Sequence, residues 1–509
     1  MALGAKTSAL VCGLSLAWVA GAAAADVRLA TAAKNGDVRT VRALIAQRVD
    51  VNAPQPDGAT ALHWAAQWDN LEMADLLLHA GAKADHADDY GTTPLALAST
   101  NGSAAMIAKL LAAGANPNAP LPTTGETPLM AASRAGKVGA VAVLLAHHAK
   151  VDAAEPTQGQ TALMWAAAEG HADVVKALLA AGADASGRTK TGTTPLLFAA
   201  REGDLEVTKS LLAAGAKVDQ ASSDGTTPLI VATIRGHLAY ATFLLDQGAN
   251  PNLGPGFTPL HWAAGEWPLD YTNDGTRILA EDNEWTPLGG LRGAARLDFV
   301  KVLVAHGADV NARATSTPRA YVGLGARGRA AAARSRGSAA LRGATPFLLA
   351  AQAGAVDVMR FLVEKGADPL AKTTNNITAA MLAAGLGRRI GKFQTTIDES
   401  LAALTLTLAL GNDINAVNND GETALHGPAY LNRAAVAQLL VEKGARLNQK
   451  DKRGWTPLTV AEGNYTGGVY IHSPDVIEVL RKAGAQPSPA NIERDATVLA
   501  TLAGKGEAE

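Results

Sequence analysis

Apolar and polar positions along this chain follow a pattern that recurs about every 33 residues. Its most regular mark is a Thr followed by Pro or Ala and then an apolar residue, found at Thr60, Thr93, Thr127, Thr161, Thr194, Thr227, Thr258, Thr286, Thr345, Thr378, Thr423 and Thr456. The five intervals between the first six are 33, 34, 34, 33 and 33 residues. A fixed period of this length predicts a stack of small helical units rather than one globular core.

One repeat is enough to predict the elements of all the others. Asp224-Gly225 is a turn signal, and Thr227 followed by Pro228 is a helix start, because Thr caps the first turn and Pro lacks only an N–H that has no partner there. A short Ala-rich helix follows. A second helix over 238–247 has apolar residues at helical spacing, and Gly248 ends it. Each repeat is therefore predicted to be a turn, a short helix, a loop, a longer helix and a Gly stop.

These residues resemble the ankyrin repeats. The best copies of the motif are Thr60-Ala-Leu-His63, Thr258-Pro-Leu-His261 and Thr423-Ala-Leu-His426, and the resemblance covers nearly all of residues 27–486. It implies a mainly α fold, an ankyrin-repeat solenoid of about twelve helix-pair units with β-hairpin tips and an N-terminal helical cap. It also implies a protein-binding scaffold without catalysis, whose partners contact the concave groove and the hairpin tips.

Breaks in the period suggest where the chain divides. The predicted segments are a signal peptide at 1–25, a capping helical unit at 26–56, regular repeats at 57–264, an irregular insertion at 265–284, a repeat at 285–311, an Arg/Ala/Gly-rich insertion at 312–342, repeats at 343–486 with insertions at 385–398 and 463–474, and a tail at 487–509. Insertions in repeat arrays fall in loops, often on the binding face. Tolerated drift in loop length explains them equally well.

The first 25 residues have the features of a secretory signal peptide. Lys6 supplies a positive charge, residues 10–19 form an apolar run, and residues 23–25 are three alanines suited to cleavage before Asp26. The single cysteine, Cys12, lies in this segment, so a mature chain has no disulfide to form or lose. We therefore expect a periplasmic or secreted bacterial protein that is cleaved near Ala25.

Net charge and hydropathy limit the classes of partner. The formal net charge is −2, which does not favour a general nucleic-acid or membrane-surface protein. No segment after the signal peptide is long and apolar enough to span a bilayer. We expect one or more protein partners, no nucleic acid, and no membrane span after cleavage.

Aromatic side chains are the first candidates for partner contacts. A column four residues after the repeat Thr contains several of them, and others lie at first-helix ends or just ahead of the Thr. The candidates are Trp64, Trp68, Trp165, Phe198, Trp262, Trp267, Phe257, Trp285 and Trp455. Exposed aromatics would anchor a partner. The alternative is packing between adjacent first helices, and exposure is expected most for Phe257, Trp285 and Trp455 at hairpin tips.

The Arg-rich insertion offers a second candidate surface. Its candidate contacts with a polyanion are Arg319, Arg327, Arg329, Arg334 and Arg336. A nucleic acid, an anionic lipid or an acidic glycan would be the ligand. A solvated Ala/Gly/Arg loop is the alternative that its composition favours. A third hypothesis is a secreted effector that acts on host proteins.

The histidines are predicted to be structural. His63, His261 and His426 occupy the same position of three separate repeats, so they cannot converge on one metal ion. The family resemblance makes them hydrogen-bonding links between hairpin loops. The sequence contains no nucleophile elbow, zinc-protease motif, phosphate-binding loop or CxxC. We therefore expect no catalytic residue, no metal and no cofactor, and do not expect an enzyme.

Overall fold

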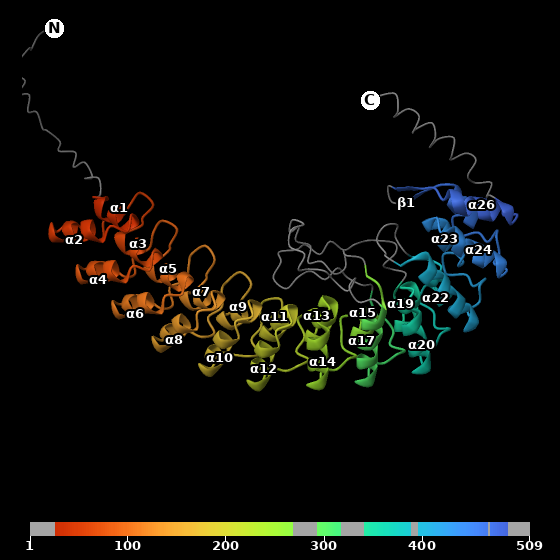
Figure 1. Ribbon diagram of the computed structural model, residues 1–509, viewed down its shortest axis with the longest axis horizontal. Coiled ribbons are helices and arrows are strands. Elements are labelled where there is room, and N and C mark those ends of the chain that lie inside the picture. Colours follow the sequence, from red (N-terminus) through yellow and green to blue (C-terminus); the bar gives the residue numbers. More distant parts are fainter. Residues whose placement is uncertain (1–25, 268–292, 317–340, 388–394, 467–468, 487–509) are drawn as a thin grey trace, which may run out of the picture. The chain divides into compact units, whose positions relative to one another are not determined.

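The computed structural model describes residues 26–267, 293–316, 341–387, 395–466 and 469–486 (Figure 1). Almost all of its regular structure is helical, in twelve consecutive helix pairs within these ranges. The helices are α1 (Arg28–Lys34), α2 (Val38–Ala46), α3 (Ala61–Gln67), α4 (Leu71–His79), α5 (Pro94–Asn101), α6 (Ala104–Ala112), α7 (Pro128–Arg134), α8 (Val138–Ala146), α9 (Ala162–Ala168), α10 (Ala172–Ala180), α11 (Pro195–Glu202), α12 (Leu205–Ala213), α13 (Pro228–Arg235), α14 (Leu238–Asp246), α15 (Pro259–Ala264), α17 (Gly293–Ala305), α19 (Pro346–Gln352), α20 (Val356–Glu364), α21 (Ala379–Ala383), α22 (Ile397–Ala409), α23 (His426–Leu431), α24 (Ala434–Glu442), α25 (Pro457–Glu462) and α26 (Pro474–Lys482).

The chain forms two compact bodies. The N-terminal body holds the described residues up to 135 together with 142–149, and the C-terminal body holds 136–141 and the described residues from 150 onward. Within each body the first helices of the pairs lie in one row and the second helices in another (Figure 1). We call the row of first helices, with the loops that precede them, the first-helix face of that body.

Local chemistry fixes where each helix begins and ends. The Thr194 hydroxyl accepts a hydrogen bond from the Leu197 N–H at 3.3 Å, and Pro195 occupies the first helical position. The following helix, α12, is capped by the carboxylate of Asp204, which accepts from the Val207 N–H at 2.9 Å. Gly248 ends α14 with φ at +85°, a conformation that costs glycine little. The starts and stops predicted from Thr-Pro and Gly are therefore confirmed.

Each helix pair buries its apolar side chains against the pairs on either side of it. Helix α3 packs against α1 on one side and α5 on the other, while α4 packs against α2 and α6. Leu62, Ala65 and Ala66 of α3 are fully buried, as are Met73 and Leu77 of α4. Alanine on the first helices lets the neighbouring backbones approach closely, so the apolar core runs along the stack.

A side-chain ladder joins the loops that follow the second helices. The amide of Asn52 donates to the Gly81 carbonyl at 3.2 Å and accepts from the Lys83 N–H at 2.8 Å. Asn252 makes the same two bonds, to the Gly307 carbonyl at 2.9 Å and from the Asp309 N–H at 2.8 Å. Each rung satisfies two backbone groups of the next pair, which would otherwise lack a protein partner.

The chain departs from the expected repeat order after Thr258. Helix α15 packs against α17, and α15 also packs against α19, so α15 and α17 form one pair that α19 and α20 follow. We had expected an insertion at 265–284 and then a separate repeat at 285–311. Instead, the helix of that repeat completes the pair that begins at Thr258, and Thr286 lies outside the described residues.

Two further predicted insertions fall partly within the described residues. In the segment 385–398, residues 388–394 lie outside the described part, and α22 begins at Ile397 with 13 residues where most second helices have 9. In the segment 463–474, strands β1 (Asn464–Thr466) and β2 (Val469–Ile471) form an antiparallel two-stranded sheet that pairs Tyr465 with Tyr470. The signal peptide at 1–25, most of 312–342 and the tail at 487–509 lie outside the described residues.

The tips that we expected to be β-hairpins are hydrogen-bonded loops. In the described loops that precede the first helices, the only β-type pairing is the isolated antiparallel bridge between Ala154 and Thr161. A typical loop is closed by the Asp88 N–H, which donates to the Thr92 carbonyl at 2.9 Å. The next residue, Asp89, donates its N–H to the Asp57 carbonyl of the preceding loop at 3.0 Å. Successive loops therefore bond to one another in a row.

Buried histidine side chains also link successive loops. The Thr60 N–H donates to Nδ1 of His63 at 3.1 Å, which leaves Nε2 protonated to donate to the Thr92 carbonyl at 3.0 Å. His261 and His426 make equivalent bonds, to the Ala344 carbonyl at 3.1 Å and the Trp455 carbonyl at 3.5 Å. The predicted structural role of these histidines is confirmed. Both ring nitrogens are used by the neutral imidazole, so a second proton would disrupt this arrangement.

Burial lowers the pKa of His261 to about 4, from 6.5 for an ordinary histidine. The unfolded chain therefore binds the proton more tightly than the folded chain, and stability that is present above pH 6.5 is lost as the pH falls toward 4. We expect this residue to lower the free energy of unfolding by about 3 kcal/mol over that interval. Urea denaturation of wild type and His261→Gln between pH 7 and pH 4 measures it. The variant is expected to show a shallower decline, exposed His472→Gln serves as the control, and equal slopes for His261→Gln and wild type would contradict the assignment.

Candidate functional site

The first-helix face of the N-terminal body carries an aromatic pair. Trp64 of α3 is half-buried and donates its indole N–H to Gln55 at 3.0 Å. Trp68, at the end of α3, is 56% exposed and donates its indole N–H to the Lys34 carbonyl at 3.1 Å. The two rings stack with centroids 6.3 Å apart and planes 22° apart. Both indole N–H groups are occupied, so the exposed Trp68 offers its ring to a partner.

Sequence reasoning missed one exposed aromatic on this face. Tyr90 lies in the loop before α5 and is 70% exposed. The predicted anchors lie four residues after the repeat Thr, at first-helix ends or just ahead of the Thr, whereas Tyr90 lies three residues before Thr93. The turn sequence Asp88-Asp89-Tyr90-Gly91 was the available signal, because the central positions of such a turn point away from the core.

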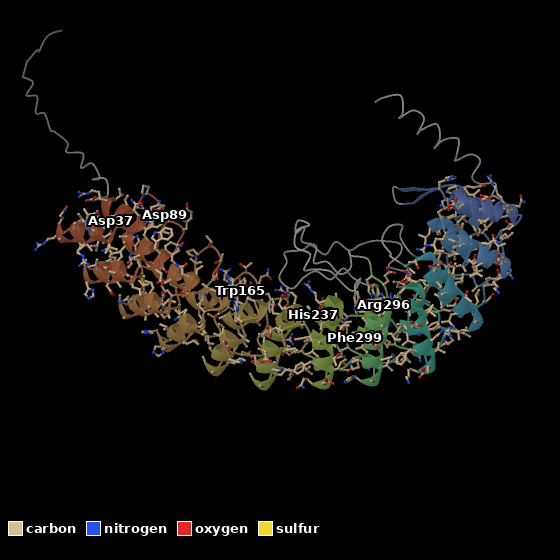
Figure 2. All side chains as sticks on the ribbon, viewed as in Figure 1. Asp37, Asp89, Trp165, His237, Arg296 and Phe299 are labelled. Carbon is tan, nitrogen blue, oxygen red and sulfur yellow. The ribbon has the colours of Figure 1, made fainter. Side chains whose placement is uncertain are left out.

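In the C-terminal body, the first two aromatics of the column differ in exposure. Trp165 on α9 is half-buried and lies on the first-helix side (Figure 2). Phe198 on α11 is only 2% exposed, and the Arg201 guanidinium lies 5.7 Å from the centroid of its ring. Trp165 can contact a partner, whereas Phe198 packs in the core.

Three aromatic side chains that we considered as anchors form a buried cluster instead. Phe257 is 2% exposed, and Trp262 and Trp267 are each 5% exposed. The ring centroid of Trp267 lies 4.5 Å from that of Trp262 and 5.4 Å from that of Phe257. The expected exposure of Phe257 is therefore wrong. The chain turns at Gly265 and brings Trp267 back over α15, where its indole N–H donates to the Trp262 carbonyl at 3.0 Å.

None of the remaining candidates is an exposed side chain of the described residues. Trp455 is half-buried rather than exposed, because the Arg453 guanidinium lies 4.1 Å from the centroid of its ring. Trp285 lies outside the described residues, as do the candidate polyanion contacts Arg319, Arg327, Arg329, Arg334 and Arg336.

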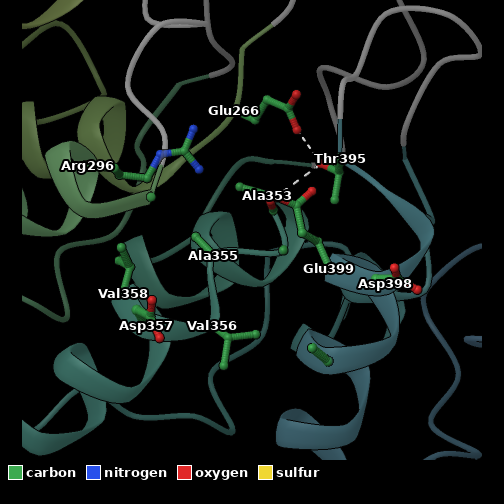
Figure 3. Close-up of a pocket in the computed structure, with 13 residues that line it drawn as sticks. Glu266, Arg296, Ala353, Ala355, Val356, Asp357, Val358, Thr395, Asp398 and Glu399 are labelled. Carbon is green, nitrogen blue, oxygen red and sulfur yellow. Dashed lines mark hydrogen bonds between the residues drawn. The ribbon is translucent and has the colours of Figure 1, made fainter.

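A pocket of about 380 Å³ lies in the C-terminal body, among the turn before α20 and the starts of α17 and α22 (Figure 3). Two of its charged side chains are buried, Glu266 at 7% and Arg296 at 6% exposed. The Thr395 hydroxyl donates to the Glu266 carboxylate, and Asp398 and Glu399 line the pocket beside them. Hydrogen bonding thus holds Glu266 in place.

The described residues offer no obvious site for metal chemistry. No group of three or more His, Cys, Asp or Glu side chains in this part of the chain is arranged to hold a metal ion. None of the described helices is long and apolar enough to cross a membrane. The arrangement that the described residues do present is a row of first helices with exposed aromatic side chains, and this suits binding of another molecule.

Comparison with known proteins agrees with this architecture. The family model for ankyrin repeats in three copies matches residues 29–121, 106–189, 182–254 and 397–491, and the single ankyrin repeat model matches 342–374. The NF-kappa-B p105 subunit of Mus musculus is 46% identical over 76 residues, which are 14% of this chain and 8% of that protein. The B-cell lymphoma 3 protein of Homo sapiens is 31% identical over 183 residues, 30% of this chain and 38% of that one.

The other similarities are also partial. The potassium channel AKT1 of Arabidopsis thaliana is 36% identical over 72 residues, 14% of this chain and 8% of the channel. Among solved structures, the human ASB11 ankyrin repeat domain is 32% identical, with a TM-score of 0.37, and the match covers 40% of this chain and 90% of that domain. This chain therefore spans less than a tenth of the p105 subunit and of the channel.

The family models cover well over half of the sequence, and the helix pairs, capped Thr starts and Gly stops occur where the models match. The ankyrin-repeat fold is typically a non-catalytic scaffold for protein–protein interaction. This chain belongs to the ankyrin repeat family.

Proposed function

We propose that this protein is a non-catalytic scaffold of the bacterial envelope, which binds partner proteins through the first-helix face and the loop tips of its repeats. The observation that carries the proposal is the exposure of Trp68 and Tyr90, at 56% and 70%, on the first-helix face of a folded body. Large aromatic side chains held in place by a rigid scaffold anchor protein interfaces at little cost in entropy.

The support for rigid presentation comes from the contacts behind these side chains. Trp68 is fixed by its bond to the Lys34 carbonyl and by stacking on Trp64. The loop that carries Tyr90 is bonded to the preceding loop through Asp89 and Asp57. A partner would therefore meet a surface that is already ordered, and this lowers the entropy cost of association.

The envelope part of the proposal rests on the amino-terminal sequence. Residues 1–25 combine Lys6, an apolar run and three alanines, and the single cysteine lies within them. A chain exported in this way would reach partners in the periplasm or outside the cell.

Partner capture tests the binding surface. We expect immobilised mature protein to retain a defined set of proteins from an envelope extract, and the double variant Trp68→Ala, Tyr90→Ala to retain at least tenfold less, since hot-spot aromatics each contribute about 2 kcal/mol. Leu370→Ala is the matched control, because Leu370 is 51% exposed in a loop of the C-terminal body. Unchanged capture by the double variant, measured by quantitative mass spectrometry, would rule out this surface.

Cell fractionation tests the location. We expect the chain expressed in a bacterium to be recovered from the periplasm or the medium, and its amino-terminal sequence to begin at Asp26. Deletion of residues 2–25 supplies the control, because a chain without the signal peptide should stay in the cytoplasm. Recovery of the full-length chain from the cytoplasm, beginning at Met1, would contradict export.

A further inference from the structure

Two consecutive helix pairs of the N-terminal body have an unusual charge on their first-helix side. Residues 52–70 and 84–102 form the loops and first helices of two consecutive pairs, and they contain five Asp and no Glu, Lys or Arg. The whole chain is nearly balanced, with 45 Lys and Arg against 47 Asp and Glu. The five are Asp57, Asp69, Asp85, Asp88 and Asp89. Within the described residues, none of them forms an ion pair.

Three of these carboxylates are engaged by backbone groups of the loops. Asp57 accepts from the Ala59 N–H at 3.1 Å, Asp85 from the Asn116 N–H at 2.7 Å, and Asp88 from the Thr92 N–H at 2.7 Å. Asp69 and Asp89 are exposed and bear no comparable structural bond among the described contacts. These two carboxylates can therefore be changed without removing a loop contact. Figure 2 labels Asp89 on this face.

The backbone at Asp69 has a conformation that favours glycine over other residues. Its φ is +51°, in the left-handed region. The corresponding residue, between the first and second helix, is glycine in most other pairs, with φ of +70° at Gly36, +73° at Gly102 and +69° at Gly136, and it is Asn432 with φ of +51° in the pair of α23 and α24. Glycine adopts this conformation more readily than aspartate. An aspartate at this position therefore adds a negative charge beside Trp68 at some cost to folding.

The aromatic side chains lie on the same face. Trp68 and Tyr90 are the most exposed large apolar side chains of the described chain. Trp68 lies at the C-terminal end of α3, and Trp64 of the same helix bonds to Gln55 in the loop before it. Tyr90 lies in the loop before α5, which bonds to the loop before α3 through Asp89 and Asp57. The Lys34 ammonium lies 4.8 Å from the centroid of the Trp64 ring, so one indole of the pair already receives a cation.

We infer that this acidic aromatic face, made of Asp57, Asp69, Asp89, Trp64, Trp68 and Tyr90, binds a Lys/Arg-containing segment of a protein partner. The inference rests on the proposed function and specifies the chemistry of its partner. Lysine and arginine side chains satisfy carboxylates and pack on indole and phenol rings with the same group. Both kinds of contact are offered together here.

Other partner chemistries fit this face less well. An acidic segment or a polyanion would be repelled by the carboxylates of Asp57, Asp69 and Asp89, none of which forms an ion pair within the described residues. A neutral apolar segment would cover the rings but would also remove water from Asp69 and Asp89 without supplying a partner. Only a cationic segment both pairs with the carboxylates and packs on the aromatic rings.

Fluorescence anisotropy of the full mature chain with labelled peptides tests the inference. The probes are twelve-residue peptides of alternating Arg and Ala, and of alternating Glu and Ala. We expect binding of the Arg peptide only. The double variant Asp69→Gly, Asp89→Asn is expected to weaken it by about fivefold, from two lost charge contacts, and Trp68→Ala by a similar factor through loss of cation–π contact. Arg-peptide affinity that is equal in wild type and both variants would overturn the inference.

Two controls separate a binding role from a structural one. Glu72→Gln removes one charge from α4, the second helix of the same pair, where Glu72 bonds to the exposed Arg42, and it should leave peptide binding unchanged. Asp69→Gly alone should keep or raise the melting temperature while it weakens binding. A lower melting temperature with unchanged affinity would assign Asp69 a structural role and overturn its part in the site.

The capture experiment distinguishes failure of this inference from failure of the proposed function. If envelope proteins are retained but the Arg peptide neither binds nor displaces them, the inference fails and the scaffold function stands. If the Arg peptide binds as expected and no envelope protein is retained, the acidic aromatic face is supported and the envelope role fails. If neither is observed, both are wrong.

Discussion

Each helix pair in the described part of this protein depends on its neighbours to keep its apolar side chains out of water. Leu62 and Ala65 of α3 are fully buried because α1 and α5 lie on either side of the helix. The same holds for Met73 and Leu77 of α4, which rely on α2 and α6. The stability of such a stack is approximately the sum of two contributions, the intrinsic stability of each helix pair and the contacts between neighbouring pairs. Every other feature of the fold, including the hydrogen-bonded loops and the binding surface, depends on this mutual burial.

Features with a local cause could be predicted from the sequence. Thr194 followed by Pro195 starts a helix, and Gly248 ends one, because each acts on backbone groups within a few residues. The structural role of His261 was implied by the family resemblance, because its partner, the Ala344 carbonyl, lies 83 residues further along the chain. The pairing of α15 with α17 could not be predicted from the sequence in this way. Thr286 has the same local signal as the other repeat threonines, and such a signal does not specify which helix will pack beside it.

Exposure of the aromatic side chains could not be predicted for the same reason. Trp68 lies at the end of α3, where its indole bonds back to the Lys34 carbonyl of the preceding pair, and it remains 56% exposed there. Trp262 belongs to the same sequence column as Trp64, yet it is buried because the turn at Gly265 returns Trp267 onto it. Burial at these positions is decided by neighbours that are distant in sequence or that depend on an irregular turn.

The asparagine ladder has a consequence for how this chain can evolve. Asn52 reaches a carbonyl 29 residues ahead, whereas Asn252 and Asn311 reach carbonyls 55 residues ahead with the same geometry. The same asparagine–carbonyl bond therefore forms between neighbouring repeats whether 29 or 55 residues separate the two groups. Because each bond joins residues on either side of the longer interval, the number of residues between two repeats can change during evolution while both repeats keep these contacts.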